Sequence, residues 1–219
     1  METEEQMLEE GLRPGDLLFQ LSKGQEVEWL ISRLFSGVNG QALNHVGLYI
    51  GNNHIIEAVS PRVQEVKVEQ FVNRAAIDLK GKPCVTIARL IPEYCSLVDK
   101  AIDFAQDCLS HPYDNSYGNC SGWYCSQLII EAFRFANNGH FLFQETPMSF
   151  KDPETGKIFP YWDIFYKSRG ERVPEGQPGS HPALLSLSHQ LTIVKIVGEL
   201  PFKNLREFGS SFNAQCEIV

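Results

Sequence analysis

Three residue types that together support thiol catalysis occur in two short segments of this chain. LNHVGLYIGNNHIIEA, residues 43 to 58, contains His45 and Glu57 among apolar residues. GNCSGWYCSQLIIEA, residues 118 to 132, contains Cys125 at the start of an apolar run. A thiol nucleophile needs an imidazole to accept its proton, and that imidazole needs an acceptor that fixes its orientation. Whether these three residues act together depends on the elements that carry them.

Cys125 lies in the first turns of a predicted helix. WYCSQLIIEAFRFA, residues 123 to 136, is apolar on nearly every side, which predicts a buried helix. The N-terminus of a helix carries partial positive charge and unpaired N–H groups, which stabilise a thiolate and an oxyanion. The alternative is that Cys125 is only a small buried residue. Cys120 is a weaker candidate, because we expect it in the turn before the helix.

His45 and Glu57 lie on the two strands of a predicted β-hairpin. The strands run over about residues 43–50 and 54–59, joined at Gly51-Asn52-Asn53. A three-residue loop would place both side chains on one face as diagonal neighbours, and a two-residue loop would place them on opposite faces. His54 is an alternative base, which we expect to be solvated beside the turn. A core histidine and a strand-edge charge are the structural alternatives for His45 and Glu57.

The sequence offers little support for a metal or nucleotide site. It contains no HxxxH or CxxC pair, no Walker-type loop and no GxGxxG motif. We therefore expect neither a metal ion nor a cofactor.

The remaining pattern predicts an α+β domain. Strands are expected within residues 12–21, 63–71, 83–91 and 190–200, and helices over 26–37 and 96–110. Beyond residue 140 the chain is rich in Pro and Gly with interleaved aromatics, which indicates long ordered loops. No repeat or linker is evident, so residues 1–219 are expected to form one domain, with a core at about 12–136 and an elaboration at 137–219.

The amino-acid composition indicates which partners and which cellular compartment we expect for the protein. Hydrophobic residues make up 43% of the 219 residues, as in a soluble globular protein, and 27 acidic against 19 basic residues give a net charge of -8. This charge argues against nucleic acid as a partner. No apolar run approaches a membrane span, the acidic start lacks a leader, and six irregularly spaced cysteines fit a reducing compartment. We expect a cytoplasmic protein, or an exported one if a leader has been removed.

The order of the motifs resembles a known family. GDLLF, NHVGLYIG, IIEA and YCSQLI, in this order, are similar to the circularly permuted NlpC-type papain-like enzymes, in particular the YaeF/YiiX-like amidases. The resemblance covers about residues 12–136. It implies a small antiparallel sheet or partial barrel packed against helices, with Cys125 as nucleophile, His45 as base and Glu57 as the orienting residue. It also implies a substrate pocket that includes Tyr124.

Three functions follow from this combination. The leading hypothesis is a cysteine hydrolase that cleaves a peptide or other amide through a thioester. A second is a thiol-dependent lipid acyltransferase or lipid-amide hydrolase, whose acyl pocket would be lined by a mainly aromatic set: Phe141, Leu142, Phe143, Phe159, Tyr161, Trp162, Phe165 and Tyr166. Packing of those aromatics onto the core is the simpler explanation. A third is a papain-like binding module without catalysis. The Pro/Gly-rich segment 171–182 is a candidate wall of the cleft.

Overall fold

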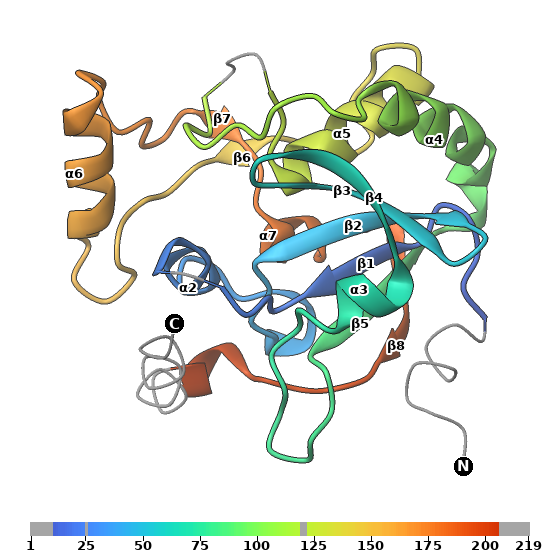
Figure 1. The fold of residues 1–219 in the computed structure, drawn as a ribbon, viewed down its shortest axis with the longest axis horizontal. Helices are drawn as coiled ribbons and strands as arrows, with labels where there is room; N and C mark the ends of the chain where they lie inside the picture. Colours follow the sequence, from blue (N-terminus) through green and yellow to red (C-terminus); the bar gives the residue numbers. More distant parts are fainter. Residues whose placement is uncertain (1–10, 25, 119–121, 206–219) are drawn as a thin grey trace.

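The computed structural model describes residues 11–24, 26–118 and 122–205. One antiparallel sheet of six strands forms its centre, in the order β4-β3-β2-β1-β5-β8 (Figure 1). The strands are β1 (Leu17–Gln20), β2 (His45–Gly51), β3 (His54–Val59), β4 (Arg62–Lys67), β5 (Val85–Leu90) and β8 (Leu191–Ile196). The strand at one edge, β8, comes from the C-terminal part of the chain, so this part completes the sheet.

Helices surround the sheet and carry the connections. The α-helices are α2 (Glu26–Ser32), α3 (Val68–Val72), α4 (Val98–Asp107), α5 (Cys125–Ala136), α6 (Pro160–Ser168) and α7 (Pro182–Leu185). The described residues also contain the 3-10 turns η1 (Val38–Gly40), η2 (Pro92–Leu97) and η3 (Phe202–Asn204). The predicted α+β class and the antiparallel sheet packed against helices are confirmed.

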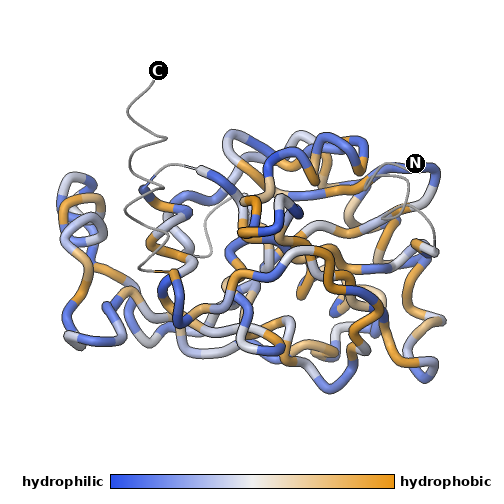
Figure 2. Tube along the Cα trace, turned by 90° about the horizontal axis from the view of Figure 1, so that it is seen from below, coloured by the Kyte–Doolittle hydropathy of each residue, from blue (hydrophilic) through white to orange (hydrophobic). Residues whose placement is uncertain are grey.

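The two faces of the sheet bury separate apolar clusters. Because side chains alternate along a strand, Leu48 and Ile56 contribute to the cluster that contains α4 and α5, whereas Tyr49 and Ile55 contribute to the cluster around α3. α5 is buried along most of its length, as its nearly uniform apolar sequence predicts. Figure 2 shows hydrophobic segments running through the middle of the molecule, with hydrophilic segments mainly at its periphery.

The hairpin that carries His45 and Glu57 has the shorter of the two loops that the sequence left open. Gly51 pairs with His54, so the turn contains only Asn52 and Asn53, both with positive φ. A bulge between Tyr49 and Gly51 inserts one extra residue into β2 and shifts the register. A two-residue turn without a bulge would place the side chains of His45 and Glu57 on opposite faces of the sheet. Because the bulge adds one residue to β2, both side chains lie on the same face.

The C-terminal half contains more regular structure than its composition predicts. α6 begins at Pro160, where a missing N–H is harmless at a helix start, and a two-stranded ribbon joins β6 (Thr146–Pro147) to β7 (Pro178–Gly179). Of the aromatics considered for an acyl pocket, Phe143 lies in the core, and Phe159, Trp162 and Tyr166 pack with residues of α2. Packing is therefore the main use of these side chains.

Candidate active site

Cys125 is the first residue of α5, at the place that the sequence predicts. The residue before it, Tyr124, has an extended backbone and offers no side-chain cap to the helix. The first N–H groups of α5 therefore remain available to another acceptor. Cys125 is 6% exposed and lines a mainly apolar cavity between α2, α5 and the segment near Ser180.

His45, the first residue of β2, connects the thiol to the carboxylate. Its Nε2 lies 2.6 Å from Oε2 of Glu57, and its ring lies near enough to Cys125 for the thiol to act on the pKa of the imidazole. Because Glu57 engages Nε2, Nδ1 is the ring nitrogen left for the sulfur. Burial disfavours the charged ring, but the hydrogen bonds and charges of Cys125 and Glu57 outweigh it and raise the pKa of His45 to about 9. The structure thus brings all three sequence-predicted side chains together.

Glu57 is fully buried and has partners that sequence reasoning missed. Arg74 Nη2 donates to both carboxylate oxygens, at 2.5 and 2.7 Å, and Gln64 Nε2 donates to Oε1 at 2.9 Å. Burial alone would raise the pKa of Glu57, yet His45 and Arg74 lower it to about 2. The one available signal was the tight connection of β3 to β4, which pairs Glu57 with Gln64. No sequence pattern pointed to Arg74.

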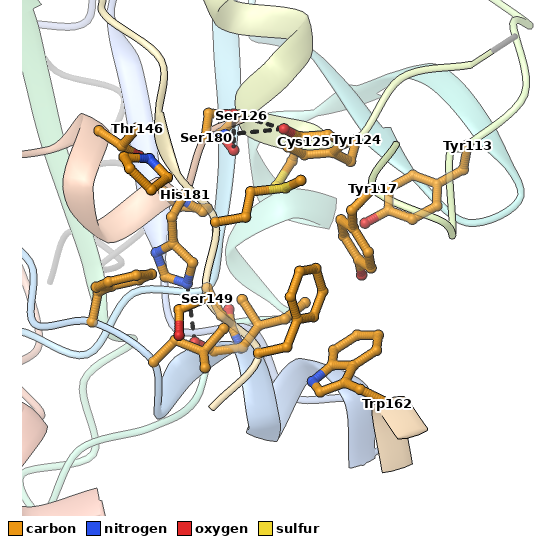
Figure 3. Close-up of a pocket in the computed structure, with 18 residues that line it drawn as sticks. Tyr113, Tyr117, Tyr124, Cys125, Ser126, Thr146, Ser149, Trp162, Ser180 and His181 are labelled. Carbon is orange, nitrogen blue, oxygen red and sulfur yellow. Dashed lines mark hydrogen bonds between the residues drawn. The ribbon is translucent and has the colours of Figure 1, made fainter. Parts of the chain in front are cut away.

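An uncharged cavity opens beside the sulfur. It encloses about 520 Å³ of empty space, counting its mouth, and none of its lining residues is Asp, Glu, Lys or Arg. In Figure 3, Tyr113 and Tyr117 lie on one side of Cys125 and His181 lies on the other. Trp162 is the one residue of the aromatic set proposed for an acyl pocket that lines this cavity.

The segment around Ser180 closes the cavity next to α5. The hydroxyl of Tyr124 accepts a hydrogen bond from the backbone N–H of Ser180 at 3.0 Å, and Ser180 Oγ donates to Ser126 Oγ at 2.8 Å. His181 also lines the cavity; its Nδ1 accepts from the N–H of Ala183. Burial lowers the pKa of His181 to about 4, so this ring is neutral near pH 7. Of the Pro/Gly-rich segment 171–182, the last three residues, Ser180, His181 and Pro182, thus line the cavity.

The other candidates lie elsewhere. His54 Nδ1 bonds the carbonyl of Asn52 in the hairpin turn, as expected for a solvated turn residue. Cys84 and Cys108 are buried, which raises the pKa of their thiols to about 12 and about 11, and Cys95 is exposed. Cys120, Cys216 and the acidic residues 1–10 lie outside the described residues.

A cysteine at the start of a helix, facing a histidine on a sheet strand, defines a papain-like site, and here the histidine strand precedes the cysteine helix. This order is the permuted one. The chain belongs to the family of permuted papain-like amidase enzymes, YaeF/YiiX, C92, whose sequence pattern matches residues 11–195. The match extends past the segment 12–136 that carried the resemblance.

Two relatives illustrate the likeness. The probable lipoprotein peptidase YaeF of Escherichia coli (strain K12) is 29% identical, over 59% of this chain and 57% of the relative. The chain thus spans somewhat more than half the length of this curated relative. The crystal structure of metalloprotein YiiX from Escherichia coli O157:H7 superposes with a TM-score of 0.62 at 21% identity, covering 84% of this chain and 97% of that one. At this identity the superposition speaks for the fold alone.

Two further observations concern metals and membranes. YiiX is described as a metalloprotein, but the described residues of this chain contain no group of three or more His, Cys, Asp or Glu side chains placed to hold a metal ion. Within the same residues, every helix is too short or too polar to span a bilayer. The compartment of the protein stays a prediction.

Proposed function

We propose that this protein is a cysteine amidase in which Cys125 is the nucleophile, His45 the general base and acid, and Glu57 the orienting carboxylate. The observation that carries the proposal is that His45 lies between Cys125 and Glu57, with Nε2 2.6 Å from the carboxylate and the thiol acting on the same ring. The family to which the chain belongs supports amide chemistry in general. The roles of the individual residues are the proposal.

The first half of the reaction forms a thioester. His45 holds the proton of Cys125, so that a thiolate faces an imidazolium, and the sulfur attacks the carbonyl carbon of the amide. The carbonyl oxygen gains the negative charge. The backbone N–H groups at the start of α5 stabilise this oxyanion, because Tyr124 provides no side-chain cap that would occupy them.

The second half releases both products. The tetrahedral intermediate collapses, the C–N bond breaks, and the imidazolium of His45 gives its proton to the leaving amine. His45 then takes a proton from water, whose oxygen attacks the thioester; the C–S bond breaks, the carboxylic acid leaves, and the thiolate again faces the imidazolium. Glu57 accepts a hydrogen bond from Nε2 throughout, which keeps the ring oriented with Nδ1 toward the reacting atoms.

The test is a screen of 7-amino-4-methylcoumarin amides that carry either peptide or fatty acyl groups. We expect Cys125→Ala to lose all turnover of any amide that the wild-type protein cleaves, while its circular dichroism spectrum and melting temperature change little. Cys95→Ala is the matched control, because Cys95 is an exposed free thiol. Turnover that survives in Cys125→Ala would end the proposal.

The uncharged cavity favours a second candidate, a thiol-dependent lipid acyltransferase or lipid-amide hydrolase. Its walls contain aromatic and aliphatic side chains such as Phe35, Met148 and Phe150, and His181 is neutral there. A charged group would lose its hydration in such a cavity without finding a counterion, which costs free energy. Burial of an apolar acyl group there is favourable.

Mass spectrometry separates the two candidates. Wild-type protein is incubated with phosphatidylcholine vesicles or with a peptide amide, and the peptide containing Cys125 is examined for an added acyl group. An acyl adduct from the vesicles that is absent in Cys125→Ala supports the lipid candidate. Adducts from peptides alone would remove it.

A further inference from the structure

We propose that Arg74 is a positioning residue of the active site, which holds Glu57 in its charged form so that the shared proton stays on His45. This inference rests on the proposed function. Arg74 is not among the residues that line the cavity next to the sulfur, and its side-chain hydrogen bonds at the site go to the carboxylate of Glu57. It follows α3, at the side of the sheet that carries His45 and Glu57.

The contacts of Glu57 leave its carboxylate saturated. Oε2 accepts from His45 Nε2 at 2.6 Å and from Arg74 Nη2 at 2.7 Å. Oε1 accepts from the same Arg74 nitrogen at 2.5 Å and from Gln64 Nε2 at 2.9 Å. The charged groups that act on Glu57 are thus His45 from β2 and Arg74 after α3, while β4 contributes the uncharged Gln64.

A buried carboxylate next to an imidazolium has two possible states. The pair can keep its charges, or the proton can move to the carboxylate and leave two neutral groups, which burial favours because it penalises charge. A guanidinium within hydrogen-bond distance stabilises the charged carboxylate and cannot itself be deprotonated at ordinary pH. Arg74 therefore shifts this balance toward the imidazolium that the reaction requires.

Arg74 is itself held in place. Its guanidinium lies 5.7 Å from the ring centroid of Phe71, and Phe71 stacks on the ring of His45 at 5.6 Å. The carbonyl oxygen of Arg74 accepts a hydrogen bond from the N–H of Lys23 at 2.7 Å. One aromatic side chain thus contacts both the guanidinium and the imidazole, which fixes their relative position.

The chain offers a matched control. Arg89 donates from Nε and Nη2 to the two oxygens of Asp16, both at 2.7 Å, and Asp16 is fully buried like Glu57. This second arginine–carboxylate pair belongs to the same sheet but has no contact with His45. Loss of Arg89 should affect folding much as loss of Arg74 does, without the electrostatic effect on the active site.

The experiment compares Arg74→Gln, Arg74→Lys and Arg89→Gln in the full chain. The ¹³C signal of the Glu57 carboxyl carbon, assigned with Glu57→Gln, is followed by NMR as the pH is lowered. In parallel, the alkylation rate of Cys125 by iodoacetamide is measured against pH by peptide mass spectrometry. We expect Arg74→Gln to move the Glu57 titration, and the acid limb of alkylation, upward by about one pH unit or more. Arg74→Lys should move both by less, because it keeps a positive charge near Glu57. Arg89→Gln should move neither.

The two readouts keep this inference separate from the proposed function. A Glu57 titration that is the same in Arg74→Gln as in Arg89→Gln would overturn the inference, whatever the reactivity of Cys125. If instead the Glu57 titration moves as expected but Cys125 is unreactive in the wild-type protein, Arg74 keeps its effect on Glu57 and the proposed amidase fails. Should Arg74→Gln not fold, Arg74→Lys provides the same comparison at a smaller amplitude.

Discussion

Replacing Glu57 by glutamine tests how far the carboxylate sustains the charged form of His45. Glutamine keeps the size of the side chain and one accepting oxygen, but it removes the negative charge that faces Nε2 at 2.6 Å. Burial lowers the pKa of His45, whereas Cys125 and then Glu57, each through a hydrogen bond and a charge, raise it. Without the carboxylate, the pKa of His45 should fall from about 9 toward its ordinary value of 6.5.

The size of the effect follows from this shift. At pH 7.5 an imidazole with a pKa of about 9 is about 97% protonated, and one with a pKa of 6.5 is about 9% protonated. The fraction of molecules with an imidazolium at His45, the group that stabilises the thiolate, therefore falls up to about tenfold. Since free thiols ionise unaided with a pKa of about 8.5, the difference in alkylation rate should vanish above that pH.

Two measurements check this prediction. The Cε1–Hε1 resonance of His45, assigned with His45→Asn, is titrated by NMR in the wild-type protein and in Glu57→Gln. Alkylation of Cys125 by iodoacetamide is then compared at neutral pH, where we expect a several-fold decrease. A His45 midpoint that stays near 9 in Glu57→Gln would refute the reasoning, because the carboxylate would then contribute nothing to the charge of the ring.

Three further predictions follow from buried groups. The depressed pKa of Glu57, about 2 against 4.5 in the unfolded chain, stabilises the fold by about 3 kcal/mol above pH 4.5, and this contribution disappears as the pH falls toward 2. In Glu57→Gln, the free energy of unfolding measured with urea should therefore depend less on pH between these two values. A pH dependence equal to that of the wild-type protein would contradict the prediction. A Cβ atom added at Gly179 would lie 2.5 Å from the side chain of Met148, so Gly179→Ala should displace the ribbon and lower the melting temperature by a few degrees; an unshifted transition would show that the ribbon adapts. Cys84 and Cys108 should stay unmodified by iodoacetamide at pH 8 in the folded protein, since burial raises the pKa of both thiols, and their labelling before unfolding would contradict this.

Local sequence patterns were sufficient to locate the active-site elements. The uniform apolar run after Tyr124 predicts a buried helix with Cys125 at its start, and the alternating residues around the Asn52-Asn53 turn predict the hairpin. These inferences depend on residues close in sequence, where helical and strand periodicity are strong signals.

The contacts between distant segments were not predictable from the same patterns. The bulge in β2 leaves no distinct residue signature, and the sequence alone would have left His45 and Glu57 on one face or on opposite faces. Arg74 reaches Glu57 only because α3 packs against the sheet at that point. The cavity likewise combines side chains from α2, α5 and the segment near Ser180, which meet only in the folded chain.

The most direct test of the proposed active site compares two cysteines of the same molecule. Cys125 is buried and Cys95 is exposed, so accessibility alone would make Cys95 the faster to react. If His45 holds Cys125 as a thiolate, iodoacetamide at about pH 6 should alkylate Cys125 at least about tenfold faster than Cys95, and His45→Asn should reverse the order. Faster alkylation of Cys95 in the wild-type protein would contradict the account.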